Sequence, residues 1–167
     1  GSPDDAADAD TVHGLGRRKN DVFREVLETA RATAYADAVR FLDRLEASGV
    51  SVAAISASRN AEAVLRSAGI RDRFAVLVDG VVSAERGITG KPAPDIFLEA
   101  AADLGVAPGE AVVAEDAVSG IRAGKQGGFA LVLGIARNAD PATLREAGAD
   151  AVVDSFDAVA IGEEPRQ

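Results

Sequence analysis

The amino-acid sequence predicts an α/β fold built on a parallel β-sheet. Short apolar runs alternate with segments of helical periodicity between about residues 37 and 153, and this alternation is typical of crossover units that join parallel strands. The runs are almost continuously apolar, as expected for strands that helices cover on both faces. A length of 167 residues with 47% hydrophobic residues is enough for one domain with a buried core.

The elements can be assigned in order along the chain. Two helices are expected first, over about residues 20–32 and 37–47, because apolar residues recur there at helical spacing. The expected strands then span residues 50–55, 74–78, 111–114, 129–135 and 151–153. The expected helices between them span residues 61–68, 94–104, 117–126 and 141–147. Pro94 at the start of one helix and Gly105 after its end are typical boundary signals.

Composition and charge exclude several classes of protein. The net charge of −9 disfavours an extended surface for nucleic acid or for an anionic membrane. No apolar run approaches the ~20 residues that a membrane span needs. Cysteine is absent, which excludes disulfides and thiol chemistry and fits a cytoplasmic protein. We therefore expect neither nucleic acid nor a membrane as a partner.

Candidate functional residues are expected just after the strands, because ligands of open parallel sheets bind beyond the carboxyl ends of the strands. The first expected strand is followed by Ser56, Ala57, Ser58, Arg59 and Asn60. Hydroxyls and backbone N–H groups at a strand-to-helix turn suit an anion. Simple capping of the next helix by Ser56 or Ser58 is the alternative.

A lysine and two adjacent carboxylates follow other elements of the same sheet. Lys91 lies in the loop Gly90–Asp95, which two prolines stiffen, so its charge is available for a phosphate or a carboxylate. A solvated surface lysine is the alternative. Glu115 and Asp116 follow the expected strand 111–114, and oxygen ligands at such a position suit Mg²⁺. Capping by Asp116, with Glu115 exposed, is the alternative. Without a ligand, we expect Lys91 to pair with one of these two acids.

Together, these three motifs resemble those of the haloacid dehalogenase superfamily. The strings SASRN, GKPAPDIF and EDAVSG are most similar to its beta-phosphoglucomutase branch, and the resemblance covers about residues 15–159. It implies a Rossmann-like parallel sheet core with the remnant of a helical cap. It also implies catalytic roles for Ser56 and Lys91, a Mg²⁺ cofactor held by Glu115 and Asp116, and a phosphorylated sugar as substrate. The N–H of Ala57 would contact the phosphoryl group, and Ser58, Arg59 and Asn60 would hold the distal end of the sugar phosphate.

The resemblance extends upstream into the segment Gly14–Asn20. The run Arg18-Lys19-Asn20 is similar to the opening of the last cap helix in that branch, which implies that Lys19 binds the sugar phosphate. A solvated basic cluster is the alternative. The implied organisation is a flexible tail over residues 1–13, the end of the cap over 14–34, the core over 35–160 and a tail over 161–167. His13, the only histidine, is expected to be a surface or cap-packing residue.

The resemblance also implies a nucleophilic Asp at the end of a strand ahead of the cap, with a second Asp two residues on. Asp8 and Asp10 have this spacing, but the preceding GSPDDAA cannot form a buried strand, and catalysis needs carboxylates held rigidly. We therefore expect the spacing to be coincidental. The chain is then the C-terminal part of a longer enzyme whose first strand, nucleophile and first part of the cap are missing. The strands around Ile55 and Val113 would lack their shared neighbour.

The function expected from the sequence is Mg²⁺-dependent phosphotransfer on a sugar phosphate through an aspartyl-phosphate in the parent enzyme. A beta-phosphoglucomutase-like reaction is the leading interpretation. A sugar-phosphate phosphatase is one alternative. A non-catalytic module that binds a phosphorylated ligand or a protein is the other. The chain alone is expected to be inactive, and its missing N-terminal segment is a candidate partner.

Overall fold

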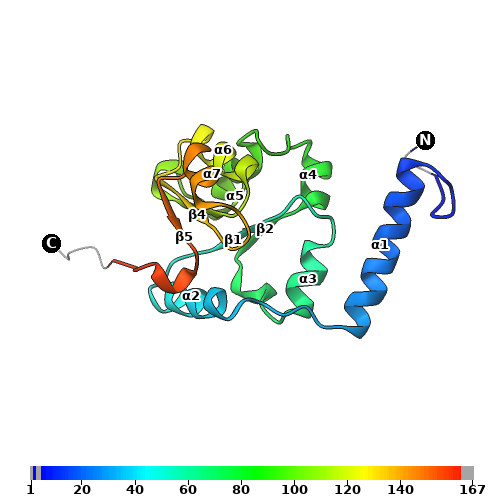
Figure 1. Cartoon of the computed structure of the whole chain (residues 1–167), viewed down its shortest axis with the longest axis horizontal. Helices are drawn as coiled ribbons and strands as arrows, with labels where there is room; N and C mark the ends of the chain where they lie inside the picture. Colours follow the sequence, from blue (N-terminus) through cyan, green and yellow to red (C-terminus); the bar gives the residue numbers. More distant parts are fainter. Residues whose placement is uncertain (1, 3–4, 163–167) are drawn as a thin grey trace.

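The computed structural model describes residue 2 and residues 5–162, and it confirms the α/β fold with parallel strands (Figure 1). The strands are β1 (Ala53–Ile55), β2 (Val76–Val78), β3 (Val112–Glu115), β4 (Leu131–Ile135) and β5 (Ala151–Val153). The expected helices are found as α2 (Ala36–Ala47), α3 (Ala61–Ser67), α5 (Asp95–Leu104), α6 (Val118–Gln126) and α7 (Pro141–Glu146). Each boundary of these helices lies within one residue of the expected one. Short 3₁₀ turns cover Arg71–Arg73, Pro108–Glu110 and Phe156–Ala158 (η1 to η3).

The strands form two separate parallel sheets. Among the described residues, β1 pairs only with β2, and β3, β4 and β5 form the other sheet in that order. Within the described residues, β1 and β3 therefore each have one edge without a strand partner. This agrees with the expectation that the strands around Ile55 and Val113 lack a shared neighbour.

One hydrophobic core nevertheless spans both sheets. Val78 of β2 and Val113 of β3 belong to the same buried cluster, together with Ile96 and Phe97 of α5 and Ile121 of α6. Burying each such side chain stabilises the fold by roughly 1.5–3 kcal/mol. Helix α5 contacts β1, β2 and α6 and therefore joins the two sheets from one side, whereas α2 packs against η3.

Helix α4 (Gly80–Arg86) was not predicted from the sequence. Asp79 is its N-cap, and Oδ1 of this buried carboxylate accepts the N–H groups of Val81 at 2.9 Å and Val82 at 3.1 Å. Gly87 ends the helix in the left-handed conformation with φ of 65°. An aspartate and a glycine flanking seven residues are recognisable boundary signals, so this helix could have been found.

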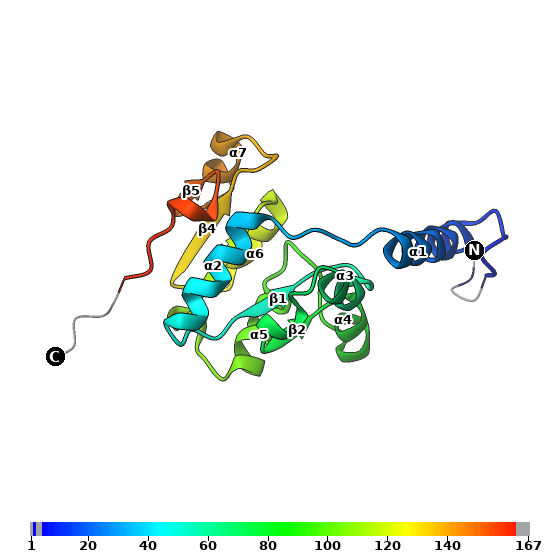
Figure 2. The same ribbon diagram turned by 90° about the horizontal axis from the view of Figure 1, so that it is seen from below.

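Helix α1 (Val12–Thr29) begins eight residues before the predicted start at Asn20. The preceding loop folds back against it, because Arg18 Nε of the helix donates to the carbonyl oxygen of Ala7 at 3.0 Å. A Cβ on Gly14 would lie 2.2 Å from the carbonyl oxygen of Ala9, so only glycine fits this contact. The helix lies apart from the sheets, beyond α3 (Figures 1 and 2), and it exposes the apolar side chains of Val12, Leu15, Val22 and Phe23.

Candidate active site

The carboxyl ends of β1, β3 and β4 open into one cavity of about 450 Å³. Ser56 and Ala57 after β1, Lys91, and Glu115 and Asp116 at the end of β3 all line it. The structure thus brings together the hydroxyl, the lysine and the carboxylate pair that the sequence singled out. Ile55 and Ala114 also line this cavity, so it lies where the free edges of the two sheets face each other.

The turn after β1 is built by serine hydroxyls. Ser56 Oγ accepts the N–H of Ser58 at 3.1 Å, and Ser58 Oγ accepts the N–H of Asn60 at 3.1 Å. The N-cap of α3 is Asn60, which makes no side-chain capping bond. The serines therefore shape the turn ahead of the helix instead of capping its first residue. Ser58, Arg59 and Asn60 belong to this turn but do not line the cavity.

Gly80 supports the same turn, and sequence reasoning missed it. Its N–H donates to the carbonyl of Ser58 at 3.1 Å. A Cβ at this position would lie 2.5 Å from the carbonyl oxygen of Ala57. The close approach of α4 to the turn therefore requires glycine here.

Lys91 is not a solvated surface lysine. Its Nζ pairs with Glu115 Oε2, and the two side chains are only 18% and 9% exposed. The ammonium also lies 4.9 Å from the ring centre of Phe97. The expected pairing of Lys91 with an acid of the neighbouring strand end is confirmed, and Glu115 is the acid that takes it.

Both carboxylate oxygens of Glu115 are engaged. Oε1 accepts the N–H groups of Asp116 at 3.2 Å and Ala117 at 3.1 Å, while Oε2 binds Lys91. Gly120 leaves the space for this carboxyl group, because a Cβ there would lie 2.1 Å from Glu115 Cδ. Glu115 is therefore neither exposed nor free, contrary to the capping alternative.

Asp116 differs from its neighbour. It is exposed, and within residues 5–162 its carboxylate takes no hydrogen bond or ion pair. The N-cap of α6 is Ala117, so Asp116 does not cap that helix. A Mg²⁺ ion prefers several oxygen ligands, and the part of the chain that is described contains no group of three or more acidic or histidine side chains that could hold a metal ion. The donors fit Mg²⁺ only in part: this chain offers Asp116, and further oxygens would have to come from elsewhere.

The upstream candidates lie away from the cavity. Lys19 is exposed on α1 and does not line it. Its neighbour Asn20 accepts a hydrogen bond from Asn60 Nδ2 at 3.2 Å, so α1 contacts the end of the serine turn. Asp8 and Asp10 are exposed in the loop before α1, and no strand precedes them in the described residues. His13 is exposed, as expected.

The lining residues with polar or aromatic side chains that were not foreseen are Tyr35, Arg137, Asn138 and Phe156. Arg137 NH2 donates to Asp37 Oδ2 at 2.6 Å. This hydrogen bond is the main reason that the pKa of Asp37 lies far below its usual range, although burial of the carboxyl acts in the opposite direction. The pair could not be read from the sequence because its members lie 100 residues apart.

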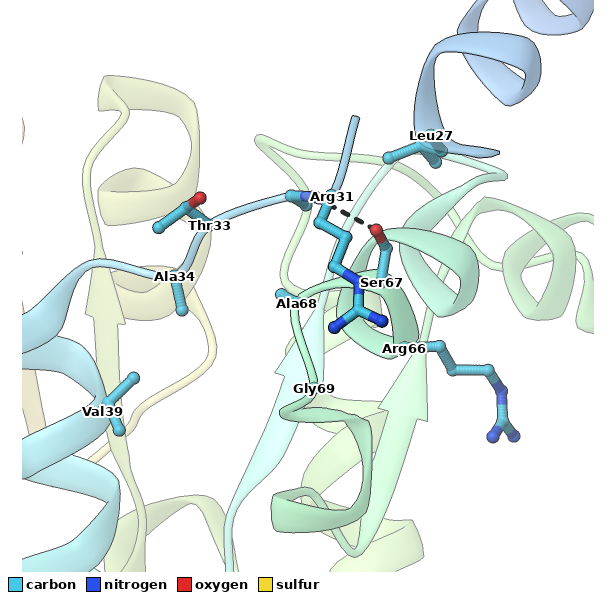
Figure 3. A pocket seen from close by; sticks show the side chains of 10 residues that line it. Leu27, Arg31, Thr33, Ala34, Val39, Arg66, Ser67, Ala68 and Gly69 are labelled. Atoms are coloured by element: carbon cyan, nitrogen blue, oxygen red, sulfur yellow. Dashed lines mark hydrogen bonds between the residues drawn. The ribbon is translucent and has the colours of Figure 1, made fainter. Parts of the chain in front are cut away.

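A second cavity, of about 720 Å³, lies between the segment 31–34 and the end of α3 (Figure 3). Ser67 Oγ accepts the N–H of Ala32 there at 3.1 Å, and Arg66 is held by Glu62 at 2.6 Å. None of the candidate residues lines this cavity. Although this cavity is larger, it lacks the lysine and the carboxylate pair found at the strand ends.

Comparison with known proteins agrees with this arrangement. The family model of the haloacid dehalogenase-like hydrolases matches residues 2–128. The chain belongs to this family. The match includes the serine turn, Lys91 and the Glu115–Asp116 pair.

Similar proteins include both a mutase and a phosphatase. The chain is 49% identical over 157 residues to the beta-phosphoglucomutase of Mycobacterium tuberculosis, covering 92% of this chain and 60% of that protein. It is 34% identical over 143 residues to hexitol phosphatase A of Escherichia coli, covering 84% and 62%. The crystal structure of beta-phosphoglucomutase from Clostridium difficile matches with a TM-score of 0.75 and 27% identity, covering 88% and 62%. The chain thus spans about three-fifths of the length of these relatives.

Within the described residues, no helix is both long and apolar enough to cross a membrane.

Proposed function

We propose that the chain is the C-terminal part of a phosphotransferase that acts on a sugar phosphate by a beta-phosphoglucomutase-like reaction. One observation carries the proposal: Ser56, Lys91 and Asp116 line one cavity at the ends of parallel strands. A hydroxyl, a cation and a carboxylate converging there suit a phosphoryl group. The 49% identity to a beta-phosphoglucomutase supports the choice of reaction.

Each residue has a distinct role in this proposal. The Ser56 hydroxyl and the N–H of Ala57 donate to phosphoryl oxygens, and Lys91 offsets their negative charge. Glu115 holds Lys91 in place through the ion pair. Asp116, with its unengaged carboxylate, would hold Mg²⁺, with Glu115 assisting only through water while its own oxygens stay engaged. When bound, Mg²⁺ supplies further neutralisation of phosphoryl charge.

The proposed nucleophile lies on a strand outside this chain. In an aspartyl-phosphate mechanism, a carboxylate oxygen forms a bond to phosphorus while the bond from phosphorus to the sugar oxygen breaks, and an acid protonates that oxygen. The free edges of β1 and β3 offer unpaired backbone groups for such a strand. We therefore assign the upstream segment of the parent enzyme as the partner of this chain.

Residues 14–34 are assigned to the end of a helical cap and residues 35–160 to the core, as the sequence suggested. The apolar side chains exposed on α1, such as Leu15 and Val22, would pack against the rest of the cap. The contact between Asn20 and Asn60 supports a substrate site shared by both parts. There, Lys19, Ser58, Arg59 and Asn60 would hold the distal end of the sugar phosphate. The tail assigned to residues 161–167 lies mostly outside the described residues.

A cytoplasmic location of the protein stays a prediction.

A sugar-phosphate phosphatase is the second candidate, and the identity to hexitol phosphatase A favours it. The two reactions differ in whether the phosphoryl group passes to a sugar or to water. A binding module without catalysis is the third possibility.

One experiment separates these three functions. The chain is combined with the upstream segment of its parent, and the complex is given Mg²⁺ and β-glucose 1-phosphate, with a catalytic amount of β-glucose 1,6-bisphosphate as primer. Formation of glucose 6-phosphate supports the mutase, whereas release of inorganic phosphate supports the phosphatase. If neither product forms but the ligand binds, the chain is a module and the proposal is wrong. Lys125→Ala serves as a matched control for Lys91→Ala, because Lys125 also pairs with a carboxylate but lies outside the cavity.

A further inference from the structure

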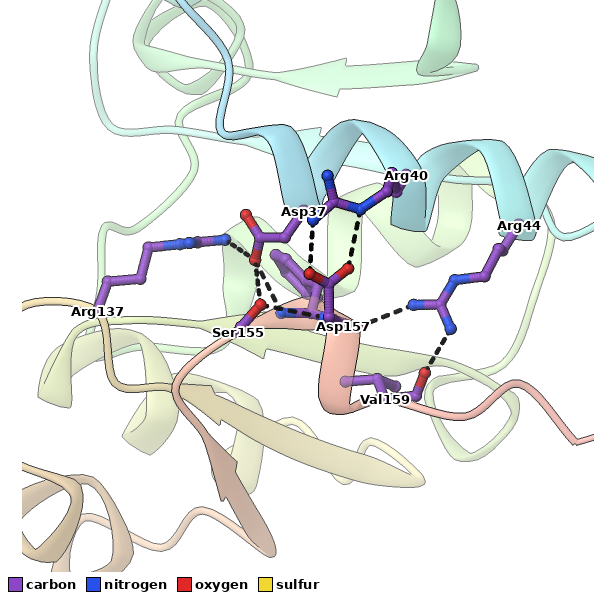
Figure 4. Close-up of polar contacts among 8 residues, drawn as sticks. Asp37, Arg40, Arg44, Arg137, Ser155, Asp157 and Val159 are labelled. Carbon is purple, nitrogen blue, oxygen red and sulfur yellow. Dashed lines mark hydrogen bonds and ion pairs between the residues drawn. The ribbon is translucent and has the colours of Figure 1, made fainter.

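Asp79 is a buried carboxylate to which the proposed reaction gives no role. It follows β2, it is only 4% exposed, and it does not line the cavity at the strand ends. Another buried carboxylate, Asp37, is paired with Arg137 (Figure 4), whereas Asp79 has no ion pair within the part of the chain that is described. Burying a carboxylate without a cation is costly unless other donors satisfy it. The donors that Asp79 uses therefore indicate what it does.

These donors belong to the first turn of α4. Oδ1 of Asp79 accepts the N–H groups of Val81 and Val82, so the carboxylate fixes the start of this helix. Helix α4 has only seven residues, and so short a helix is not stable by itself. The element that it contacts most is β2. Asp79, which joins β2 to α4, therefore determines how the first turn of the helix is held.

The backbone on either side of Asp79 holds the serine turn. β1 and β2 lie side by side (Figure 2), and their pairing continues past the strands. The N–H of Ser56 donates to the carbonyl of Val78 at 3.0 Å. The N–H of Gly80 donates to the carbonyl of Ser58 at 3.1 Å. Asp79 lies between these two bonds in an extended conformation, with φ of −114° and ψ of −174°, so one residue connects the turn to the helix.

The serine turn carries two of the proposed phosphoryl donors, the Ser56 hydroxyl and the Ala57 N–H. The N–H of Ala57 donates to no acceptor among the described residues, so it is available for a ligand oxygen. Because a Cβ on Gly80 would lie 2.5 Å from the Ala57 carbonyl oxygen, a shift of the first turn of α4 also shifts this part of the serine turn. A displacement of about 1 Å at a reacting group can cost ~100-fold in rate.

We propose that Asp79 is a positioning residue of the phosphoryl site, which holds the Ser56 hydroxyl and the Ala57 N–H in place through α4 and Gly80. This inference rests on the proposed function. The contacts that carry it join the serine turn to β2 and α4, on the paired edge of β1. They lie away from the free edge of β1 that is assigned to the upstream strand.

A direct effect of charge would have the opposite sign. A carboxylate near the site repels a phosphate, so removal of its charge alone should tighten phosphate binding. A positioning role predicts instead that Asp79→Ala weakens phosphate binding, although this variant loses a negative charge. Asp79→Asn loses the same charge but keeps an oxygen that can cap α4, so it should bind phosphate no more than about twofold more weakly than the unsubstituted protein.

Titration calorimetry with inorganic phosphate and Mg²⁺ tests this prediction on the chain combined with the upstream segment of its parent. We expect Asp79→Ala to raise the dissociation constant of phosphate roughly tenfold, as for the loss of a hydrogen bond to a charged group. A substitution that only reduces the fraction of folded molecules changes the stoichiometry of binding and leaves the dissociation constant unchanged. If Asp79→Ala does not fold, Asp79→Gly takes its place, because glycine at an N-cap destabilises a helix less than alanine does and also lacks the capping oxygen.

Asp140→Ala is the matched control. Asp140 caps α7, where its Oδ2 accepts the N–H of Thr143 at 3.1 Å, and it is exposed and does not line the cavity. This variant loses the same charge and the same kind of cap. Its dissociation constant for phosphate should stay within about twofold of that of the unsubstituted protein, because α7 does not hold the serine turn.

Lys91→Ala separates this inference from the proposed function. It should weaken phosphate binding, and unchanged binding in that variant rejects the proposed function together with the inference. If Lys91→Ala weakens binding but the folded Asp79→Ala or Asp79→Gly variant binds phosphate as tightly as Asp140→Ala, only the role of Asp79 is wrong. A loss of affinity in Asp79→Asn equal to that in Asp79→Ala also overturns it, because the cap of α4 is then not the cause.

Discussion

Lys91 is paired with Glu115, and the same carboxylate accepts the N–H groups of Asp116 and Ala117 with its other oxygen. One side chain thus fixes both the cation after α4 and the turn that carries Asp116. Phosphoryl transfer depends on charges held in place before the reaction. The Lys91–Glu115 ion pair holds these charges in place, although the two residues lie 24 positions apart in the sequence.

Replacing Lys91 should strongly reduce catalysis while the chain stays folded. In the complete enzyme, we expect Lys91→Ala to lower turnover by roughly 100-fold or more, since it removes charge that faces the phosphoryl group. The free energy of unfolding should fall by only about 1–3 kcal/mol, because Glu115 keeps its two N–H donors. Steady-state kinetics and urea denaturation measure the two effects. Turnover within a few-fold of the parent would make Lys91 a structural residue.

Gly120→Ala should disrupt the same pair from the opposite side. The new Cβ would lie 2.1 Å from Glu115 Cδ, so the carboxyl group must leave its position. We expect a loss of about 1–3 kcal/mol in the free energy of unfolding. Gly16→Ala is the matched control, because Gly16 also lies in a helix and a Cβ added there would meet no atom within 4 Å. Equal melting temperatures for the two variants would show that Glu115 does not occupy this space.

Asp37 should make the stability of the chain depend on acidic pH. Its pKa is lowered in the folded state, chiefly by the hydrogen bond from Arg137. A lowered pKa stabilises the fold above the unfolded value of about 3.9, and this contribution is lost as pH falls below that value towards the folded pKa. The free energy of unfolding, measured by urea denaturation, should therefore decrease as the pH falls from about 5 to about 2.5, and Asp37→Asn should reduce this decrease.

The control for this pH series is Asp154→Asn, which removes an exposed carboxylate with no ion pair among the described residues. This variant should show the same pH dependence of the free energy of unfolding as the unsubstituted chain. An Asp37→Asn slope equal to that of the parent would mean that the Asp37–Arg137 pair does not persist in solution.

Much of the core followed from local rules that the sequence displays directly. The helices α2, α3, α5, α6 and α7 begin and end within one residue of the expected positions, because their boundaries coincide with caps and with breaks in periodicity. The cavity residues Ser56 and Asp116 were found from their places after strands, since topology alone gathers strand ends, and Lys91 was found from its place in a loop that two prolines stiffen. The contact between Arg137 and Asp37 was not predicted, because it depends on how α2 packs against the end of β4. The early start of α1 was not predicted, because glycines such as Gly14 and Gly16 usually weaken helices. In the structure, Gly14 instead allows the preceding loop to pack against the helix.

Asp116 should be the Mg²⁺ residue that this chain contributes. Because its carboxylate has no partner among the described residues, we expect Asp116→Asn to leave the free energy of unfolding within about 0.5 kcal/mol. The same change should abolish any enhancement of phosphate binding by Mg²⁺, measured by calorimetry with inorganic phosphate. Asp154→Asn should keep the enhancement. Tight binding of Mg²⁺ to the Asp116→Asn variant would place the ion elsewhere.

The chain alone should show neither phosphomutase nor phosphatase turnover, even with Mg²⁺ and sugar phosphate at high concentration. The family chemistry needs a carboxylate held at a strand end, and the candidate pair Asp8 and Asp10 is exposed in a loop with no strand before it in the described residues. Ser56, Lys91 and Asp116 can still bind phosphate without transferring it.

The upstream segment should restore turnover when added as a separate peptide, since a strand that pairs with β1 and β3 needs no covalent link to them. Asp8→Asn should leave the restored rate unchanged. Full activity of the chain without that segment, abolished by Asp8→Asn, would show instead that the loop before α1 carries the nucleophile.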